Sequence, residues 1–168
     1  MYIQIKKIFT FVSTNIVVMN IEQIIKSTIK LSITKKVMLN LTYTKNYIGD
    51  KFTELLKTDG ISSEQYNVLR ILRGQKGNPL NMQDIQERMV AKNSNTTRLV
   101  DKLLLKEMVI RNTCPNNSRK IEIQITENGL KVLSELDPII ESHELILTEK
   151  LTNKELELLN NLLEKIRN

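Results

Sequence analysis

The chain has 168 residues, with 25 Lys and Arg against 19 Asp and Glu, which gives a formal net charge of +6. This length supports one compact domain with extended arms, and a hydrophobic fraction of 40% is enough to build its core. Aromatic residues make up 4% and Trp is absent, which argues against stacking platforms for single-stranded nucleic acid. A single Cys excludes an internal disulfide, and one Cys with one His argues against a dedicated zinc site.

The positive charge is unevenly distributed along the chain. Residues 1–57 carry a net +6, residues 58–126 carry +4, and residues 127–168 carry −4. Within the middle segment, residues 88–120 hold eight basic side chains and two acidic ones. A basic middle beside an acidic end favours a polyanion-binding surface, although an ordinary solvated face would carry the same charges.

The first eighteen residues combine two lysines with an apolar stretch, as a secretory signal peptide does. Four polar residues interrupt the stretch, no A-x-A cleavage site follows it, and it is shorter than the roughly 20 apolar residues that span a bilayer. We therefore interpret residues 1–18 as a non-structural leader or a mis-assigned start. The folded part is expected to begin near Met19, where a more regular helical pattern opens.

The first half of the chain shows two helical segments. Apolar residues three or four positions apart predict a long helix, or two consecutive helices, over residues 21–57. Gly60 ends this segment. Ser62 followed three residues later by Gln65 is the pattern of a capping box, and it predicts a second helix that ends at residues 74–77.

A short third helix and a fourth helix follow. Asn81 can cap the third helix, which runs through Met89 on an apolar stripe. The polar run of residues 92–97 then opens the fourth helix at Asn93 or Ser94. The apolar residues predicted to face inward from this fourth helix are Leu99, Val100, Leu103 and Leu104.

The next segment has the pattern of two short strands. Residues 108–113 and 121–126 alternate apolar with polar side chains, and residues 114–120 between them form a polar loop rich in turn-forming residues. This pattern predicts a β-hairpin with a basic tip.

Two more helices close the chain. Thr126 caps the first of them, which we expect to bend near Pro138 and to run to about Leu147. Thr152 with Glu155 forms a second capping box, which opens the last helix.

Three helices followed by a basic hairpin are the layout of a winged helix-turn-helix. We therefore predict a mostly α protein with a small β-hairpin wing, in which residues 61–126 form a winged helix-turn-helix DNA-binding domain. The outer helical regions, residues 19–60 and 127–168, are too apolar to stand exposed. We expect them to be dimerisation helices that bury their Ile and Leu stripes against a second copy of the chain.

The fourth helix offers the side chains that a recognition helix needs in its first turn, where base edges are contacted. Arg98 could make a two-pronged contact with guanine and Asn95 with adenine, and Lys102 could reach the flanking backbone. Runs of Ser, Asn and Thr are also ordinary helix caps, so this segment alone leaves both interpretations open. The candidate DNA-binding residues of this helix are Asn93, Ser94, Asn95, Thr96, Thr97, Arg98 and Lys102.

The hairpin adds a second basic feature at the expected place. Arg111 in the first strand, with Arg119 and Lys120 beside the turn, suits a wing that crosses a minor groove or the phosphate backbone. We also expect Asp101 to pair with Arg111 and to brace the recognition helix against the strand.

Residues 61–129 resemble the MarR family of bacterial transcriptional regulators. The matching segments are Ser63–Leu69, Asn95–Leu103, Val109–Arg111, Pro115–Arg119 and Ile125–Gly129. The resemblance implies a homodimer, joined by its N- and C-terminal helices, that binds a pseudo-palindromic double-stranded operator. It further implies a repressor that is released from DNA by a small ligand or an oxidant.

Three positions depart from that family pattern. Asn117 stands where the wing commonly has Asp, and Ser118 stands where an Arg often follows, whereas Arg119 is retained. Met108 stands where a glycine commonly precedes the first wing strand. The missing Asp predicts a looser wing tip, but the wing keeps its net positive charge.

The remaining chemical residues do not form a recognisable site. No phosphate-cradling Gly loop, G-x-S-x-G or H-E-x-x-H sequence is present, so we predict no enzyme activity, no cofactor and no metal. Cys114 is either incidental or a redox switch, because neighbouring cations can lower a thiol pKa. His143 is interpreted as a surface or interface residue. Three methionines are expected to fill the core, namely Met82, Met89 and Met108.

Two functions remain open from the sequence. The leading hypothesis is a cytoplasmic, dimeric and sequence-specific DNA-binding regulator. The alternative is a helical protein-interaction module that uses a winged-helix scaffold without DNA reading. The sequence identifies neither the small-molecule effector nor the residues that would bind it.

Overall fold

The computed structural model describes residues 19–114 and 117–168, and the side chains of residues 114–120 are outside that description. The predicted leader, residues 1–18, also lies outside the described residues. The chain forms two compact units that divide inside one helix, the first ending at Ile48 and the second beginning at Gly49.

In its described residues, 19–48, the first unit has two consecutive helical segments. The single-turn helix α2 (Ile21–Ile24) is followed, after a break, by α3 (Ile33–Leu56), which continues into the second unit. Glu22 of α2 links the two helices across this break: its carboxylate accepts a hydrogen bond from the Leu31 amide (2.7 Å) and forms an ion pair with Lys36 of α3 (2.6 Å). The bond from the Leu31 amide, followed by that from Lys36, lowers the pKa of the Glu22 carboxyl below its ordinary value.

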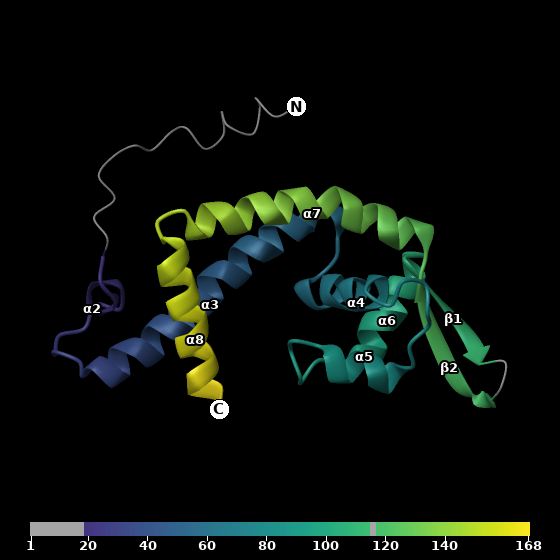
Figure 1. Cartoon of the computed structure of the whole chain (residues 1–168), viewed down its shortest axis with the longest axis horizontal. Coiled ribbons are helices and arrows are strands. Elements are labelled where there is room, and N and C mark those ends of the chain that lie inside the picture. Colours follow the sequence, from purple (N-terminus) through teal and green to yellow (C-terminus); the bar gives the residue numbers. More distant parts are fainter. Residues whose placement is uncertain (1–18, 115–116) are drawn as a thin grey trace, which may run out of the picture. The chain divides into compact units, whose positions relative to one another are not determined.

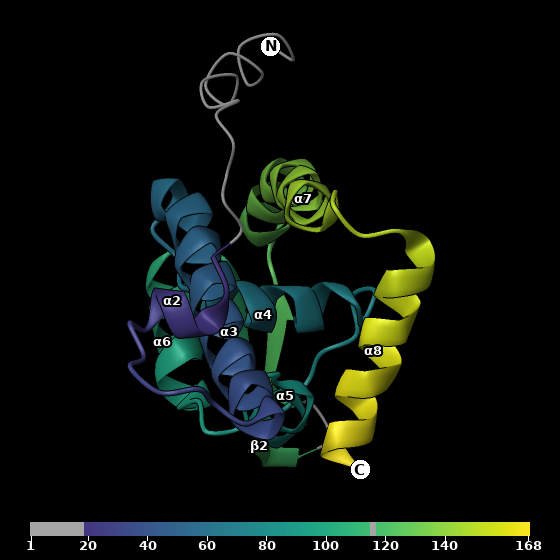
Figure 2. The same cartoon turned by 90° about the vertical axis from the view of Figure 1, so that its left-hand side faces the viewer.

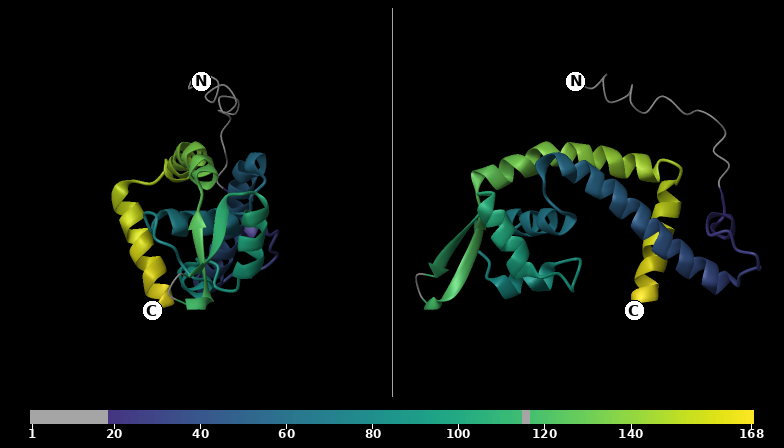
Figure 3. Two further views of the ribbon diagram at one scale, coloured as in Figure 1. Left: turned by 90° about the vertical axis from the view of Figure 1, so that its right-hand side faces the viewer. Right: turned by 180° about the vertical axis from the view of Figure 1, so that it is seen from behind.

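The second unit has the predicted mostly α composition with one hairpin. Its elements after the end of α3 are η1 (Lys57–Asp59), α4 (Ser63–Arg73), α5 (Met82–Arg88), α6 (Thr96–Leu105), β1 (Val109–Cys114), β2 (Asn117–Ile125), α7 (Glu127–Thr148) and α8 (Asn153–Arg167). In Figures 1 and 2, α4 lies between α7 and α5, and the order agrees with the packing of α4 against both helices. Figure 3 shows the hairpin projecting from the point where α7 begins.

Side-chain caps set the starts of these helices, as predicted. The capping box of Ser62 with Gln65 has both of its bonds, and Asn81, Thr126 and Thr152 cap α5, α7 and α8. Helix α6 begins later than predicted, at Thr96, because the Asn95 side chain accepts from the Arg98 amide and caps the helix there. At the other end of α4, the predicted stop at Gly74 is confirmed.

The two strands pair antiparallel, with Arg111 opposite Ile123, and their register shifts between Thr113 and Cys114. The strands are longer than predicted, since β2 already begins at Asn117. A further backbone link fixes the base of the hairpin: Leu80, in the segment before α5, exchanges two hydrogen bonds with Ile123, at 3.0 and 2.8 Å. The hairpin is therefore tied to the helices through its second strand.

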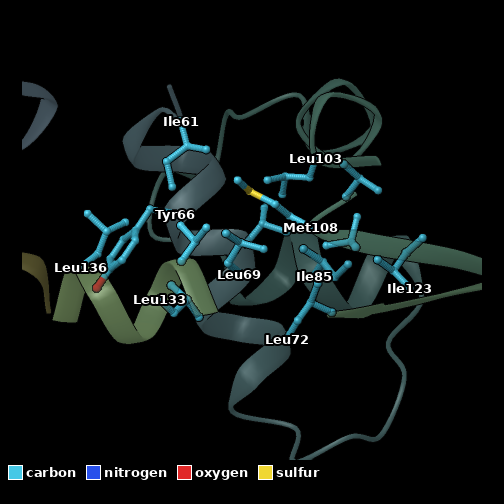
Figure 4. Packing of buried hydrophobic residues seen from close by; sticks show 14 of the residues in the cluster. Ile61, Tyr66, Leu69, Leu72, Ile85, Leu103, Met108, Ile123, Leu133 and Leu136 are labelled. Carbon is cyan, nitrogen blue, oxygen red and sulfur yellow. The ribbon is translucent and has the colours of Figure 1, made fainter. Parts of the chain in front are cut away.

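The core of the second unit lies where α4, α6, α7 and the hairpin meet. Figure 4 shows Leu69 of α4 near Leu133 of α7 and Leu72 of α4 near Ile85 of α5, with Met108 and Ile123 on the hairpin side. The apolar stripes predicted for α4, α5 and α6 face this core. The three methionines expected in the core are buried or packed against it, namely Met82, Met89 and Met108.

Helix α6 ends in a Schellman motif that brings the hairpin directly after it. The Glu107 amide donates to the Leu104 carbonyl (2.9 Å), and the Met108 amide donates to the Leu103 carbonyl (3.0 Å). Glu107 is in the left-handed region at φ 55°. The position that favours glycine is therefore Glu107, one residue before the Met108 singled out from the sequence.

The start of α7 needs its glycine for a different reason. A Cβ atom on Gly129 would lie 2.3 Å from the Met108 carbonyl oxygen and 2.8 Å from the Ile125 side chain. The same carbonyl accepts a hydrogen bond from the Thr126 amide (3.1 Å). Close approach of α7 to the strand start thus explains the glycine at the end of the matching segment Ile125–Gly129.

Candidate nucleic-acid interface

Helix α6 presents an apolar inner face and a polar outer face, as a recognition helix requires. Val100 and Leu103 are fully buried in the core. On the outer face, Thr97, Arg98 and Lys102 are exposed. The first turn of α6 therefore offers its polar side chains to a partner while the opposite side fixes the helix in the domain.

An open pocket with a volume of about 560 Å³ lies between α6 and the start of α4, and we refer to it as the concave surface. Five of the predicted DNA-binding residues line it together: Asn93, Ser94, Asn95, Arg98 and Lys102. The other lining residues are Ser62, Glu64, Ala91 and Leu99. These five polar and basic side chains thus share one surface of the folded domain.

Thr96 differs from its neighbours in the predicted set. Its side chain is only 4% exposed, and its hydroxyl donates a hydrogen bond inward to the Oε1 atom of Gln86 on α5. A buried hydroxyl that is already hydrogen-bonded is not available to a base or a phosphate. Thr96 therefore belongs to the packing of α6 and not to its exposed surface, which corrects its inclusion among the candidate contacts.

Two other candidates are partly engaged within the protein. The Oδ1 atom of Asn95 accepts from the Arg98 amide (3.0 Å), so its Nδ2 group is the freer end of the side chain. The Ser94 hydroxyl donates to the Ala91 carbonyl (2.6 Å) and keeps its lone pairs as acceptors. Both bonds shape the turn that leads into α6.

The wing is attached to α6 by an ion pair. The Arg111 Nη2 atom of β1 lies 2.6 Å from the Asp101 Oδ1 atom of α6, which confirms the predicted pairing. The predicted contacts Arg119 and Lys120, and the possible redox switch Cys114, have their side chains outside the described residues. The Arg111 guanidinium therefore connects β1 to α6 within the protein.

A second polar cluster joins α4 to α7. Asp137 accepts hydrogen bonds from the Nη1 and Nη2 atoms of Arg73, and the Tyr66 hydroxyl donates to the same carboxylate (3.4 Å). Arg70 donates to the Tyr66 hydroxyl (2.9 Å) and lies over its ring. The bond to Arg73 lowers the pKa of the Asp137 carboxyl, and the bond to Tyr66 raises the pKa of Arg70.

This second cluster borders a cavity of about 330 Å³. Its lining residues are Arg70, Arg73, Asp137, Ile140, Glu141 and Glu144. The sequence pattern did not predict this cluster, because its α4 and α7 members are 64 or more residues apart along the chain. The only local signal was the spacing of Arg70 and Arg73, which places both on one face of a helix.

Residues 19–114 and 117–168 contain no group of three potential metal ligands. No helix in these ranges is long and apolar enough to cross a membrane.

Known proteins similar to this chain are transcriptional regulators. Residues 61–121 match the MarR family. The HTH-type transcriptional regulator MhqR of Bacillus subtilis (strain 168) is 28% identical over 133 residues, which cover 78% of this chain and 89% of MhqR.

Solved structures with the same fold extend this comparison. A MarR transcription factor from Planctomyces limnophilus is 31% identical, with a TM-score of 0.61, and the match covers 81% of this chain and 98% of that one. The structure of MepR from S. aureus in complex with DNA has a TM-score of 0.70 at 20% identity, covering 80% of this chain and 96% of MepR.

Helices α4 to α6 followed by the β1–β2 hairpin define a winged helix-turn-helix protein. The order of its helices and hairpin, and the exposed polar side chains of α6, are those that this class uses on nucleic acid. The match to the family and the coverage of the Planctomyces limnophilus protein show that the chain belongs to the MarR family. It is a transcriptional regulator, as its relatives are, and the resemblance noted in the sequence is confirmed.

Proposed function

We propose that this regulator binds double-stranded operator DNA in a sequence-specific way, with the first turn of α6 in the major groove. The observation that carries the proposal is the concave surface where Asn95, Arg98 and Lys102 lie together. Long basic side chains beside short polar ones supply both phosphate binding and base contacts. The DNA complex of MepR, a protein of the same fold, supports DNA as the partner.

Individual roles follow from the geometry of α6. Arg98 is exposed and makes the guanine contact, since its planar guanidinium can bind O6 and N7 at once. Asn95 contributes chiefly through its Nδ2 group, because Oδ1 caps the helix. Lys102, one turn later on the same face, binds the flanking phosphates together with Arg119 and Lys120 of the wing.

We further propose that the protein acts as a homodimer. Helix α8 has no buried residue, and several of its large apolar side chains are exposed. These side chains are Leu158, Leu159, Leu162 and Ile166. An apolar stripe of this length is normally covered, and a second copy of the chain would place two recognition helices about one turn of DNA apart.

Repression and its release by a small molecule complete the proposal. The polar cavity beside Asp137 lies at α4, one of the helices packed against α6, so a ligand there could disturb the position of the recognition helix. The effector itself is not specified by the cavity, which offers both guanidinium and carboxylate groups. Binding to chromosomal DNA also implies that the protein works in the cytoplasm.

The test is the binding of the purified full chain to its own upstream intergenic duplex and to a scrambled duplex of equal composition. At about 150 mM salt, a specificity ratio above roughly 10³ with two chains per site is expected. Equal and weak binding to several upstream duplexes and their scrambled controls would contradict operator reading. Absence of any salt-dependent binding to duplex DNA would instead favour the protein-interaction module.

A further inference from the structure

The turn that joins α5 to α6 is held by two side-chain amides from neighbouring helices. Gln86 of α5 donates from its Nε2 atom to the Lys92 carbonyl (2.7 Å) and accepts, at Oε1, the hydroxyl hydrogen of Thr96. Asn67 of α4 accepts at Oδ1 from the Val90 amide (3.0 Å). We name these three side chains, Asn67, Gln86 and Thr96, the turn clamp.

Each amide of the turn clamp satisfies a backbone group that lies outside the helices. The Val90 amide and the Lys92 carbonyl belong to the segment between α5 and α6, where helical hydrogen bonds are not available. Gln86 uses both ends of its amide at once, so it sets the distance between the turn and the first residue of α6. The three side chains of the turn clamp lie on α4, α5 and α6, so the turn is hydrogen-bonded to all three helices.

Burial makes the bond between Gln86 and Thr96 sensitive to substitution. Thr96 is 4% exposed, and Gln86 is only partly exposed. When one partner of a buried hydrogen bond is removed, the other keeps its desolvation cost without a bond. The bond thus favours one position of the α6 start over others that would leave the amide or the hydroxyl unpaired.

We propose that the three side chains of the turn clamp are positioning residues, with Gln86 as the central one. They align the first turn of α6 so that it can contact the bases. The inference rests on the proposed function, since it concerns how the same helix is held for operator DNA. Base contacts depend on the angle and depth of Arg98 in the groove, because a two-pronged hydrogen bond needs fixed geometry. Phosphate contacts tolerate a displaced helix, because they depend mainly on charge.

The experiment compares substitutions of the turn clamp with a matched control on the same helix. Gln86→Ala removes both amide contacts, Thr96→Val removes the hydroxyl at nearly constant shape, and Thr96→Ser keeps it. Gln83→Ala is the control, because Gln83 also lies on α5 and its amide bonds only the exposed Glu87 carboxylate (2.9 Å). Each full-length variant is measured for binding to the upstream intergenic duplex and to the scrambled duplex, and by circular dichroism for helix content.

We expect Gln86→Ala and Thr96→Val each to weaken binding to the upstream duplex by about tenfold or more, with less than about a twofold change on the scrambled duplex. The double variant should bind the upstream duplex about as strongly as the more impaired of the two single variants, since both substitutions remove the bond between Gln86 and Thr96. Thr96→Ser and Gln83→Ala should bind like the wild type. Unchanged binding to the upstream duplex by Gln86→Ala and Thr96→Val, or equal losses on both duplexes, would overturn the positioning role.

A measurement without DNA separates this inference from the proposed function. Hydrogen exchange at the Val90 amide and through the first turn of α6 should be faster in Gln86→Ala than in Gln83→Ala. If the wild type does not discriminate between the duplexes, the proposed function fails, and exchange still tests the turn clamp. Equal exchange in the two variants would overturn the clamp even where the wild type reads its operator.

Discussion

Arg111 of the wing and Asp101 of the recognition helix form an ion pair at 2.6 Å. Both side chains are partly exposed, so the pair adds little to the stability of the fold. Its effect is geometric, because it connects the two elements that are proposed to contact DNA. It also places a carboxylate on the outer face of α6, where a negative charge opposes the approach of any DNA.

Replacing that carboxylate should therefore separate general affinity from specificity. Asp101→Asn removes one negative charge and weakens the bond to Arg111, so binding to scrambled duplex should strengthen by roughly two- to fivefold. The preference for operator should fall, because the wing is held less firmly against α6. The measurement is the pair of dissociation constants at two salt concentrations. Asp84→Asn on α5, whose carboxylate lies 3.9 Å from Arg88, is the control. Equal behaviour of the two variants would contradict the bracing role.

Arg98 should carry base discrimination rather than general affinity. Arg98→Ala should lower discrimination at one operator position by about 1–3 kcal/mol. Arg98→Lys should retain most of the binding to scrambled duplex yet lose the discrimination, since a lysine cannot make the two-pronged contact. Binding is measured against operators substituted at single positions.

Arg119→Ala provides the contrasting variant for that experiment. It should weaken binding to all duplexes and flatten the salt dependence by roughly one unit per lost phosphate contact. Equal losses on operator and scrambled duplex for Arg98→Ala would contradict its assignment to a base.

Much of the fold followed from local signals in the sequence. Capping patterns at Ser62, Asn81, Thr126 and Thr152 placed four helix starts, because a cap is a contact between residues three positions apart. The pairing of Asp101 with Arg111 was also predictable, since a helix that leads directly into a strand keeps its neighbours close.

Long-range contacts were not accessible in the same way. The hydrogen bond from the Val90 amide to Asn67 joins residues 23 positions apart, and the Asp137 cluster joins residues 64 or more positions apart. Neither residue type nor spacing predicts such a contact, because it depends on how the helices pack against one another. Thr96 lies four residues before Val100 and seven before Leu103, so the helical period alone places it on the buried face of α6. Its polar character pointed instead to the exposed face, because the bond that satisfies its hydroxyl comes from Gln86, ten residues away on another helix.

The left-handed residue at the end of α6 gives a stability prediction. A non-glycine residue in that region costs about 1–2 kcal/mol, part of which is offset because glycine has more freedom in the unfolded chain. Glu107→Gly should therefore raise the free energy of unfolding by up to about 1 kcal/mol, as measured by urea denaturation. Glu107→Ala shortens the side chain and retains the strained backbone, so it should not stabilise. An equal gain in both variants would show that the side chain, and not the backbone angle, is responsible.

Gly129 should be intolerant of even one added methyl group. Gly129→Ala would press its Cβ atom against the Met108 carbonyl oxygen, so the start of α7 or the strand must shift. A loss of about 1–3 kcal/mol in the free energy of unfolding is expected from such overpacking. Gly49→Ala in α3 is the matched control, because nothing lies within 4 Å of its added Cβ. That variant should gain about 0.5–1 kcal/mol from the better helix propensity of alanine. Tolerance of Ala at 129 would show that the two backbones separate freely.

The Asp137 cluster gives the protein an acid-sensitive link between α4 and α7. The hydrogen bond from Arg73 lowers the pKa of the folded carboxyl below the ordinary value of 3.8, so near that value the unfolded chain binds more protons than the folded one. The stabilisation is complete above the ordinary value and is lost as the pH falls through the folded pKa. Asp137→Asn removes this dependence, and the wild type should lose more stability than the variant between about pH 6 and about pH 3.

Urea denaturation over that range tests the effect, since urea adds no ions that screen the pair. Glu135→Gln is the control, because this exposed residue of α7 makes only a 4.0 Å pair with Lys131. It should follow the wild-type curve, whereas Asp137→Asn should start lower at neutral pH and converge with the wild type in acid. Parallel curves for the wild type and Asp137→Asn would mean that Arg73 and Asp137 do not stabilise the folded state through their charges.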